Sequence, residues 1–158
     1  MKTRRLFLGL SVAACARAID TREAAPRFRG KTIDGEAFDN DSLKGQVVLF
    51  QFWTTWCGYC RRDQDAVESI VEQYKSKNVT VIAVNVGETR KKVKAYLADN
   101  ARTCKIVLTS DTNLAAMFQA RGYPLYVVLD RNGKVAGRQE GAGGERALEA
   151  LLERALEP

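Results

Sequence analysis

The chain has 158 residues, enough for one domain, and its hydrophobic fraction of 46% is ordinary for a globular protein with a core. The formal net charge is +6, but residues 1–18 contribute four basic and no acidic side chains, which leaves 21 − 19 = +2 for the remainder. The basic balance therefore gives no reason to expect a nucleic-acid partner. No apolar run approaches the roughly 20 residues that a membrane-spanning helix needs.

Residues 1–18 indicate an export signal, because a basic start is followed by a short apolar stretch and then by small residues. Residues 3–8 resemble a twin-arginine motif, although Gly9 replaces the usual lysine and leaves the ordinary secretory route open. Residues 12–15 resemble a bacterial lipobox, which would make Cys15 a lipidated first residue and a membrane anchor. Cleavage after Ala18 would instead remove Cys15. Residues 19–27 are predicted to be a linker, and residues 28–158 the folded domain.

The domain is expected to begin with a β-hairpin, because Asp34 and Gly35 form a turn signal between two short strand-like segments. Residues 41–45 are predicted to form a capped turn. Residues 47–53 are a continuous apolar run and are predicted to be a central buried strand. Apolar residues then recur at helical spacing, which predicts a helix of about twenty residues that ends near Lys77. The recurring apolar residues are Val67, Ile70, Val71 and Tyr74.

Residues 79–85 form the next apolar run, so a strand, a crossover helix and a second strand are predicted to make a right-handed parallel βαβ unit. An amphipathic helix is expected over residues 88–100 and a short strand over 106–109. Asp111 is expected to cap a helix over residues 113–119 that Gly122 ends. Strands over 125–129 and 135–139 are predicted to form a hairpin, and a final helix to cover the sheet.

Two cysteines, Cys57 and Cys60, follow the predicted central strand at the start of the predicted helix. Unpaired N–H groups at a helix start stabilise a thiolate, so Cys57 is the expected nucleophile and is expected to be exposed. Cys60, one turn later, is placed to resolve a mixed disulfide. A structural disulfide and two inert cysteines are the alternatives. A zinc site is disfavoured, because the chain has no histidine and Cys15 and Cys104 are isolated.

Residues 52–61 resemble the FWATWCxxCR signature of the thioredoxin superfamily, and specifically its exported TlpA/ResA-like branch. The resemblance implies an α/β, thioredoxin-like fold: a mixed central sheet with helices on both faces, an N-terminal β-hairpin and an inserted αβ unit over residues 88–109. It also implies thiol–disulfide exchange at Cys57 and Cys60, with no cofactor and no metal. Cys104 is expected to be a small buried hydrophobic residue.

A second segment, Gly122, Tyr123 and Pro124 with Asp130 and Gly133 downstream, resembles the family's G-x-P-T-x-x-x-x-D-x-x-G motif, with Leu125 in place of threonine. From the residues alone, Pro124 could simply occupy the first position of a strand. The resemblance implies that the Tyr123–Pro124 bond is cis and lies beside the cysteines. It further implies that the Tyr123 backbone pairs with an extended substrate segment, with Pro124 and Trp56 completing the substrate-binding surface.

Several positions depart from the family pattern. Gln51 stands where thioredoxin has a buried aspartate that accepts a proton, a role that an amide cannot take. Asp63 replaces a glutamate that is common in TlpA/ResA-like proteins and is a candidate for tuning the pair, although an acidic residue in a first helical turn also needs no function. Asp65 stands where the family often has proline, so the usual cause of a kink in the first helix is absent. Gly58 and Tyr59 resemble the dipeptide of a periplasmic disulfide isomerase and are expected to affect the reduction potential.

The leading hypothesis is an exported thiol–disulfide oxidoreductase that reduces cysteines of other exported proteins. By resemblance it would be recharged by a membrane-embedded dithiol donor and act in cytochrome c maturation, in the periplasm or another extracytoplasmic space. The alternatives are a disulfide isomerase or oxidant, and a non-catalytic binding module. A thiol peroxidase is disfavoured because Phe50 replaces the expected proline, and a Sco-type copper carrier because it needs Cys-x-x-x-Cys and a histidine.

Overall fold

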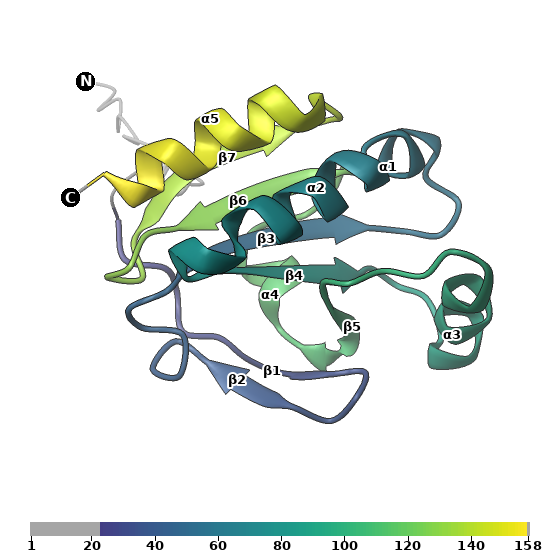
Figure 1. The fold of residues 1–158 in the computed structure, drawn as a ribbon. Helices are drawn as coiled ribbons and strands as arrows, with labels where there is room; N and C mark the ends of the chain where they lie inside the picture. Colours follow the sequence, from purple (N-terminus) through teal and green to yellow (C-terminus); the bar gives the residue numbers. More distant parts are fainter. Residues whose placement is uncertain (1–22, 158) are drawn as a thin grey trace, which may run out of the picture.

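The computed structural model describes residues 23–157, so the expected export signal, Cys15 and the first four residues of the expected linker lie outside the described residues. Seven strands form one mixed sheet in the order β2-β1-β5-β4-β3-β6-β7 (Figure 1). The strands are β1 (Arg29–Thr32), β2 (Ala37–Asp39), β3 (Val47–Trp53), β4 (Val79–Asn85), β5 (Lys105–Thr112), β6 (Leu125–Leu129) and β7 (Val135–Glu140). The helices are α1 (Gly58–Arg62), α2 (Gln64–Tyr74), α3 (Arg90–Asp99), α4 (Leu114–Met117) and α5 (Gly144–Leu156), with a 3-10 turn η1 (Lys75–Lys77) after α2.

The strand pairing confirms the mixed sheet. β3 pairs in parallel with β4, and β4 with β5, while β6 runs antiparallel to β3 and β7 antiparallel to β6. The N-terminal hairpin of β1 and β2 joins the sheet through β5. Strands β3, β4 and β6 have the bounds that their apolar runs predict.

Strand β3 is central because both of its faces are covered. Val47, Leu49 and Trp53 belong to one core cluster, which contains residues of α2 and α5. Val48, Phe50 and Phe52 belong to the other, where the Phe118 ring at the end of α4 lies 5.9 Å from Phe50 and 6.2 Å from Phe52. Burying one such side chain contributes about 1.5–3 kcal/mol, so this strand is a firm support for the loop that follows it. The prediction of helices on both faces is confirmed.

The expected helix of about twenty residues is wrong in one respect, because it is broken at Asp63 into α1 and α2. Asp63 has φ −86° and ψ −2°, outside regular helical values. Its side chain is buried and accepts hydrogen bonds from Gly143 N and Gly144 N, which begin α5. This tertiary attachment, rather than a proline, accompanies the break.

The expectation that Asp111 caps a helix is also wrong. β5 extends to Thr112 because its second half pairs with β1, and Asp111 therefore lies in a strand, where it forms an ion pair with Arg90 at 2.7 Å. Helix α4 is shorter than predicted and begins after Asn113. The left-handed residue beyond it is Gln119, with φ 50°, and not Gly122. Among residues 23–157 no helix is both long and apolar enough to cross a bilayer.

Candidate active site

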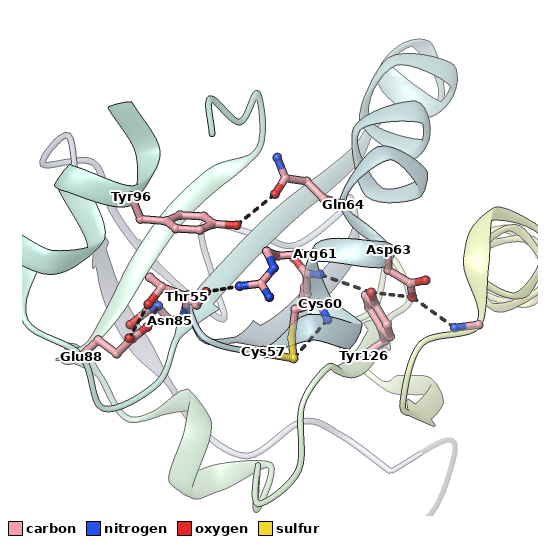
Figure 2. The surroundings of a disulfide bond; sticks show 12 residues. Thr55, Cys57, Cys60, Arg61, Asp63, Gln64, Asn85, Glu88, Tyr96 and Tyr126 are labelled. Carbon is pink, nitrogen blue, oxygen red and sulfur yellow. Dashed lines mark hydrogen bonds between the residues drawn. A yellow bond between two sulfur atoms is a disulfide. The ribbon is translucent and has the colours of Figure 1, made fainter. Parts of the chain in front are cut away.

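The two cysteines lie at the start of helix α1, which follows strand β3 after a short loop, as predicted. Cys57 is the N-cap of α1, with extended backbone angles, and its Sγ accepts a hydrogen bond from Cys60 N at 3.0 Å (Figure 2). An N-cap side chain that accepts an orphan N–H is the arrangement that stabilises negative charge at that atom. The sulfur of Cys57 is thus the one that the helix start favours as a thiolate.

Cys57 and Cys60 form a disulfide with their Cα atoms 5.2 Å apart. Both residues are only 4% exposed in this form, so the expectation of an exposed Cys57 does not hold. The reason is packing, because both belong to the core cluster that contains Trp53 and Tyr126. The two cysteines therefore differ in their position on the helix, while as residues they are equally buried.

The loop before Cys57 is held by Glu88, a contact that was not predicted from the sequence. The Glu88 carboxylate accepts hydrogen bonds from Thr55 N, Thr55 Oγ1 and Asn85 Nδ2, each at 2.7 Å (Figure 2). It also pairs with Lys92 Nζ at 2.7 Å. Burial acts to raise the pKa of Glu88, but these hydrogen bonds from Lys92, Asn85 and Thr55 outweigh it and lower the pKa from 4.5 to about 2. The turn that presents Trp56 and Cys57 is thus tied to the start of α3.

Because the Glu88 carboxylate must be ionised to make these contacts, we expect the protein to lose stability at low pH. Because the pKa of Glu88 is lower in the folded protein, its contribution is complete above about pH 4.5 and is lost as the pH falls toward about 2. We expect Glu88→Gln to lower the unfolding free energy at pH 7 and the difference from the unmodified protein to shrink over that window. Urea unfolding at a series of pH values measures it.

The matched control is Glu72→Gln, which changes an exposed carboxylate on α2. Its effect should be small and should not vary with pH in the same way. A Glu88→Gln difference that stays constant from pH 7 to pH 2 would contradict the assignment.

Aromatic side chains flank the disulfide at the surface. Trp56 is 64% exposed and Tyr59 is 59% exposed, and they are the exposed large hydrophobic residues of the described chain. The Trp56 ring meets the Tyr123 ring edge-on at 6.2 Å between centroids. The Tyr123–Pro124 peptide bond is cis, as the family resemblance implied. The structure therefore brings Trp56 and the loop at Tyr123 together, while Gly58 and Tyr59 are exposed between the cysteines.

The backbone of Tyr123 is available for pairing. Within residues 23–157, neither its N–H nor its C=O takes part in a hydrogen bond, while its hydroxyl donates to Ala120 O. Pro124, next to it, is buried, and its carbonyl accepts from Gly141 N at 2.8 Å. An extended segment that adds to this loop would find an unused donor and acceptor.

Beneath this surface lies a polar network that includes Asp63. The Tyr126 hydroxyl donates to Asp63 Oδ2 at 3.0 Å, and Gly143 N and Gly144 N donate to the same carboxylate at 3.1 Å each (Figure 2). Burial and the nearby charge of Asp63 raise the pKa of Tyr126 above its ordinary range, so the phenol stays protonated and can donate. Asp63 thereby joins the redox helix to the start of α5.

The network continues to Gln51 and Arg102. Gln51 Nε2 donates to the Tyr126 hydroxyl at 3.2 Å, and Gln51 Oε1 accepts from Arg102 at 2.8 Å. The Arg102 side chain is only 2% exposed, pairs with Glu68 at 3.3 Å and lies over the Trp53 ring at 5.3 Å. The place of the proton-accepting aspartate is thus taken by an amide that contacts a buried cation. Sequence reasoning identified Gln51 but missed Arg102 and Tyr126.

Cys104 is 8% exposed, and burial raises the pKa of its thiol to about 11. It stays protonated at neutral pH, in agreement with the expectation of a small buried hydrophobic residue. The described part of the chain contains no group of three or more histidine, cysteine, aspartate or glutamate side chains that could hold a metal ion.

The sequence pattern of the Redoxin family matches residues 21–153. Thioredoxin-like protein YneN of Bacillus subtilis is 30% identical over 138 residues, which cover 85% of this chain and 80% of that protein. Thiol-disulfide oxidoreductase ResA of Bacillus subtilis is 27% identical over 150 residues, covering 85% and 84%. The structure of a thiol:disulfide interchange protein of the thioredoxin family from Chlorobium tepidum matches with TM-score 0.76 and 26% identity, over 87% of this chain and 99% of that one.

These matches span the sheet and the helices together with both cysteines, so they concern the whole folded domain and not the motif alone. The solved structure from Chlorobium tepidum shares the fold that, in this chain, places Cys57 at a helix start. The chain therefore belongs to the Redoxin family, as a TlpA/ResA-like member of the thioredoxin superfamily, and is a thiol–disulfide oxidoreductase with a Cys57–Cys60 pair.

Proposed function

We propose that this protein is an exported reductant, which passes electrons from Cys57 and Cys60 to disulfides of other exported proteins. The observation that carries the proposal is the hydrogen bond from Cys60 N to Cys57 Sγ at the start of α1. In the reduced protein the same N–H would stabilise a Cys57 thiolate, and a thiolate is the species that attacks a disulfide.

The exchange proceeds in two displacements. The Cys57 thiolate attacks one sulfur of the substrate disulfide, forms a mixed disulfide and releases the other substrate sulfur as a thiolate, which takes up a proton. Cys60 then loses its proton and attacks Cys57, which releases the second substrate thiol. Two electrons have passed to the substrate, and the protein is left with the Cys57–Cys60 disulfide.

Substrate docking is assigned to the loop at Tyr123. Its unpaired backbone groups would add an extended substrate segment as a strand, with Trp56 and Pro124 beside the reacting sulfurs. Gln51 cannot accept the Cys60 proton. Asp63, three residues after Cys60, is assigned a tuning role through its charge, and Gly58 and Tyr59 through the backbone between the cysteines.

The proposed setting is the periplasm or another extracytoplasmic space, reached through the export signal over residues 1–18. There a membrane-embedded dithiol donor would restore the reduced form, and the substrates would include proteins of cytochrome c maturation. The supports are the pattern of residues 1–18 and the resemblance to the TlpA/ResA-like branch. Intact mass of protein from a cell envelope should show a chain that begins at a lipidated Cys15 or after Ala18, and a full-length cytoplasmic chain would contradict this setting.

The reduction potential of the Cys57–Cys60 couple tests the direction of electron flow. Protein is equilibrated with dithiothreitol or glutathione redox buffers, and the reduced fraction is counted by alkylation and mass. A reductant is expected to lie near the value of thioredoxin, about −270 mV, whereas a value near the −120 mV of a strong oxidant would favour the alternative of an oxidant. A value near −180 mV would favour an isomerase.

A further inference from the structure

Three exposed arginines lie close in the chain to the disulfide or to the loop at Tyr123. Arg61 and Arg62 are on α1, directly after Cys60, and Arg121 comes two residues before Tyr123, whose ring contacts Trp56. We call these three the cationic rim. In the described residues 23–157, none of the three forms an ion pair with a carboxylate.

The carboxylates close to the site do little to balance this charge at the surface. Asp63 is buried and held by N–H groups of α5. Glu88 has a side chain that is 5% exposed, and it is paired with Lys92. Asp65 is the exposed carboxylate at the start of α2. The cationic rim therefore carries three positive charges against Asp65, and the exposed Glu140, which lies near Arg121, is paired with Arg138.

The arginines differ in how free their guanidinium groups are. Arg61 donates to Thr55 O at 3.2 Å and so helps to hold the loop before Cys57. Arg62 lies over the exposed Tyr59 ring at 4.7 Å, and no carboxylate of residues 23–157 forms an ion pair with it. A guanidinium stacked on an aromatic ring keeps its N–H edges available for a carboxylate.

Arg121 lines a cavity of about 300 Å³ next to Gly122, on the side of the loop toward β7. Arg138 and Glu140 also line this cavity, but they pair with each other at 3.1 Å. Arg121 is therefore the charge in the cavity that has no counterpart. The cavity is also lined by Gly122, the residue before Tyr123, so it lies next to the loop whose backbone is unpaired.

We propose that Arg62 and Arg121 select substrate segments that carry aspartate or glutamate beside the reactive cysteine. The inference rests on the proposed function and adds the chemistry of the substrate to it. Guanidinium groups bind carboxylates through two parallel hydrogen bonds, which fixes orientation as well as charge. Because the contacts are at the surface, the preference should weaken as salt shortens the Debye length from about 30 Å at 0.01 M to about 8 Å at 0.15 M.

The test uses peptides that differ only in the residues flanking one cysteine, which are glutamate, glutamine or lysine. Each cysteine carries a small neutral thiol as a mixed disulfide, and the rate constant for oxidation of the reduced protein is measured by stopped flow. At low salt we expect the glutamate peptide to react at least about fivefold faster than the lysine peptide, with glutamine between them, and the ratio to fall toward one at high salt.

Variants assign the effect to residues. In Arg62→Gln and Arg121→Gln, the ratio of the glutamate to the lysine rate constant should fall, and this ratio is insensitive to any change in the intrinsic reactivity of Cys57. The matched control is Arg154→Gln, which removes the same charge at the far end of α5 and should keep the ratio (Figure 1).

The outcomes separate the two levels of the proposal. Hydroxyethyl disulfide, which has no charge, reports whether the unmodified protein exchanges disulfides at all. If it reacts, and the glutamate and lysine peptides react equally fast at low salt, the charge preference is wrong and the proposed function stands. If Arg154→Gln lowers the ratio as much as Arg121→Gln does, the effect is one of net charge and the assignment to the rim is wrong. If no disulfide reacts, the proposed function fails and this inference with it.

Discussion

The Cys57→Ser variant is expected to lose disulfide reductase activity down to the background rate, a loss on the order of a thousandfold. A serine hydroxyl does not ionise near neutral pH, so the hydrogen bond from Cys60 N would have no thiolate to stabilise. The Cys60→Ser variant should behave differently, because it keeps the nucleophile and loses the group that resolves the intermediate. It should accumulate mixed disulfides with substrate, visible as adducts that a reductant removes.

Cys104→Ala is the matched control, since it removes a third sulfur that is buried and remains protonated. Its turnover should match that of the unmodified protein. In the reduced protein, alkylation at low pH should label Cys57 before Cys60. Equal labelling rates, or adducts that accumulate equally in the Cys57→Ser and Cys60→Ser variants, would contradict the assigned roles.

The Asp63→Ala variant is expected to lower the unfolding free energy by about 3 kcal/mol. The substitution leaves Gly143 N, Gly144 N and the Tyr126 hydroxyl without their shared acceptor, and a buried donor without a partner costs about 1–3 kcal/mol. The three costs need not add, since water can enter the space that the carboxylate leaves. Urea unfolding of the oxidised protein is the measurement, because the disulfide is then present in both proteins.

Asp65→Ala is the control for this variant, as it removes a neighbouring carboxylate that is exposed at the start of α2. A surface change of that kind usually alters stability by no more than about 0.5 kcal/mol. Asp63→Asn should fall between the two, because an amide keeps one acceptor oxygen for the N–H groups. Similar losses for Asp63→Ala and Asp65→Ala would mean that the buried contacts contribute little.

The strands were predictable because their signal is local. β3 and β4 are continuous apolar runs, and burial on both faces is what such runs indicate. The helix break at Asp63 was not predictable in this way. Its partners, Gly143 and Gly144, lie about eighty positions away in the sequence. An aspartate near the start of a helix is also common in helices that are not broken, so the residue itself does not indicate a break.

The same contrast holds at the active site. The spacing of Cys57 and Cys60 after a strand identified the redox pair from sequence alone. Arg102 and Glu88 were missed because their roles depend on contacts with Gln51 and Thr55, which are separated from them by 51 and 33 positions. A charged residue ahead of a strand or a helix is normally solvated, and only the packing shows that these two are not.

The first described residue lies at the opposite end of strands β3 and β6 from the disulfide. Val135 N donates to Glu23 O at 2.9 Å, which places the first described residue beside the turn between β6 and β7. β6 spans five residues, roughly 16 Å, from the loop at Tyr123 to this turn. A tether attached upstream of Glu23 would therefore join the domain at the end of the sheet opposite Cys57. Lengthening a flexible tether would enlarge the volume that the Cys57 sulfur can reach and would let the domain rotate more freely.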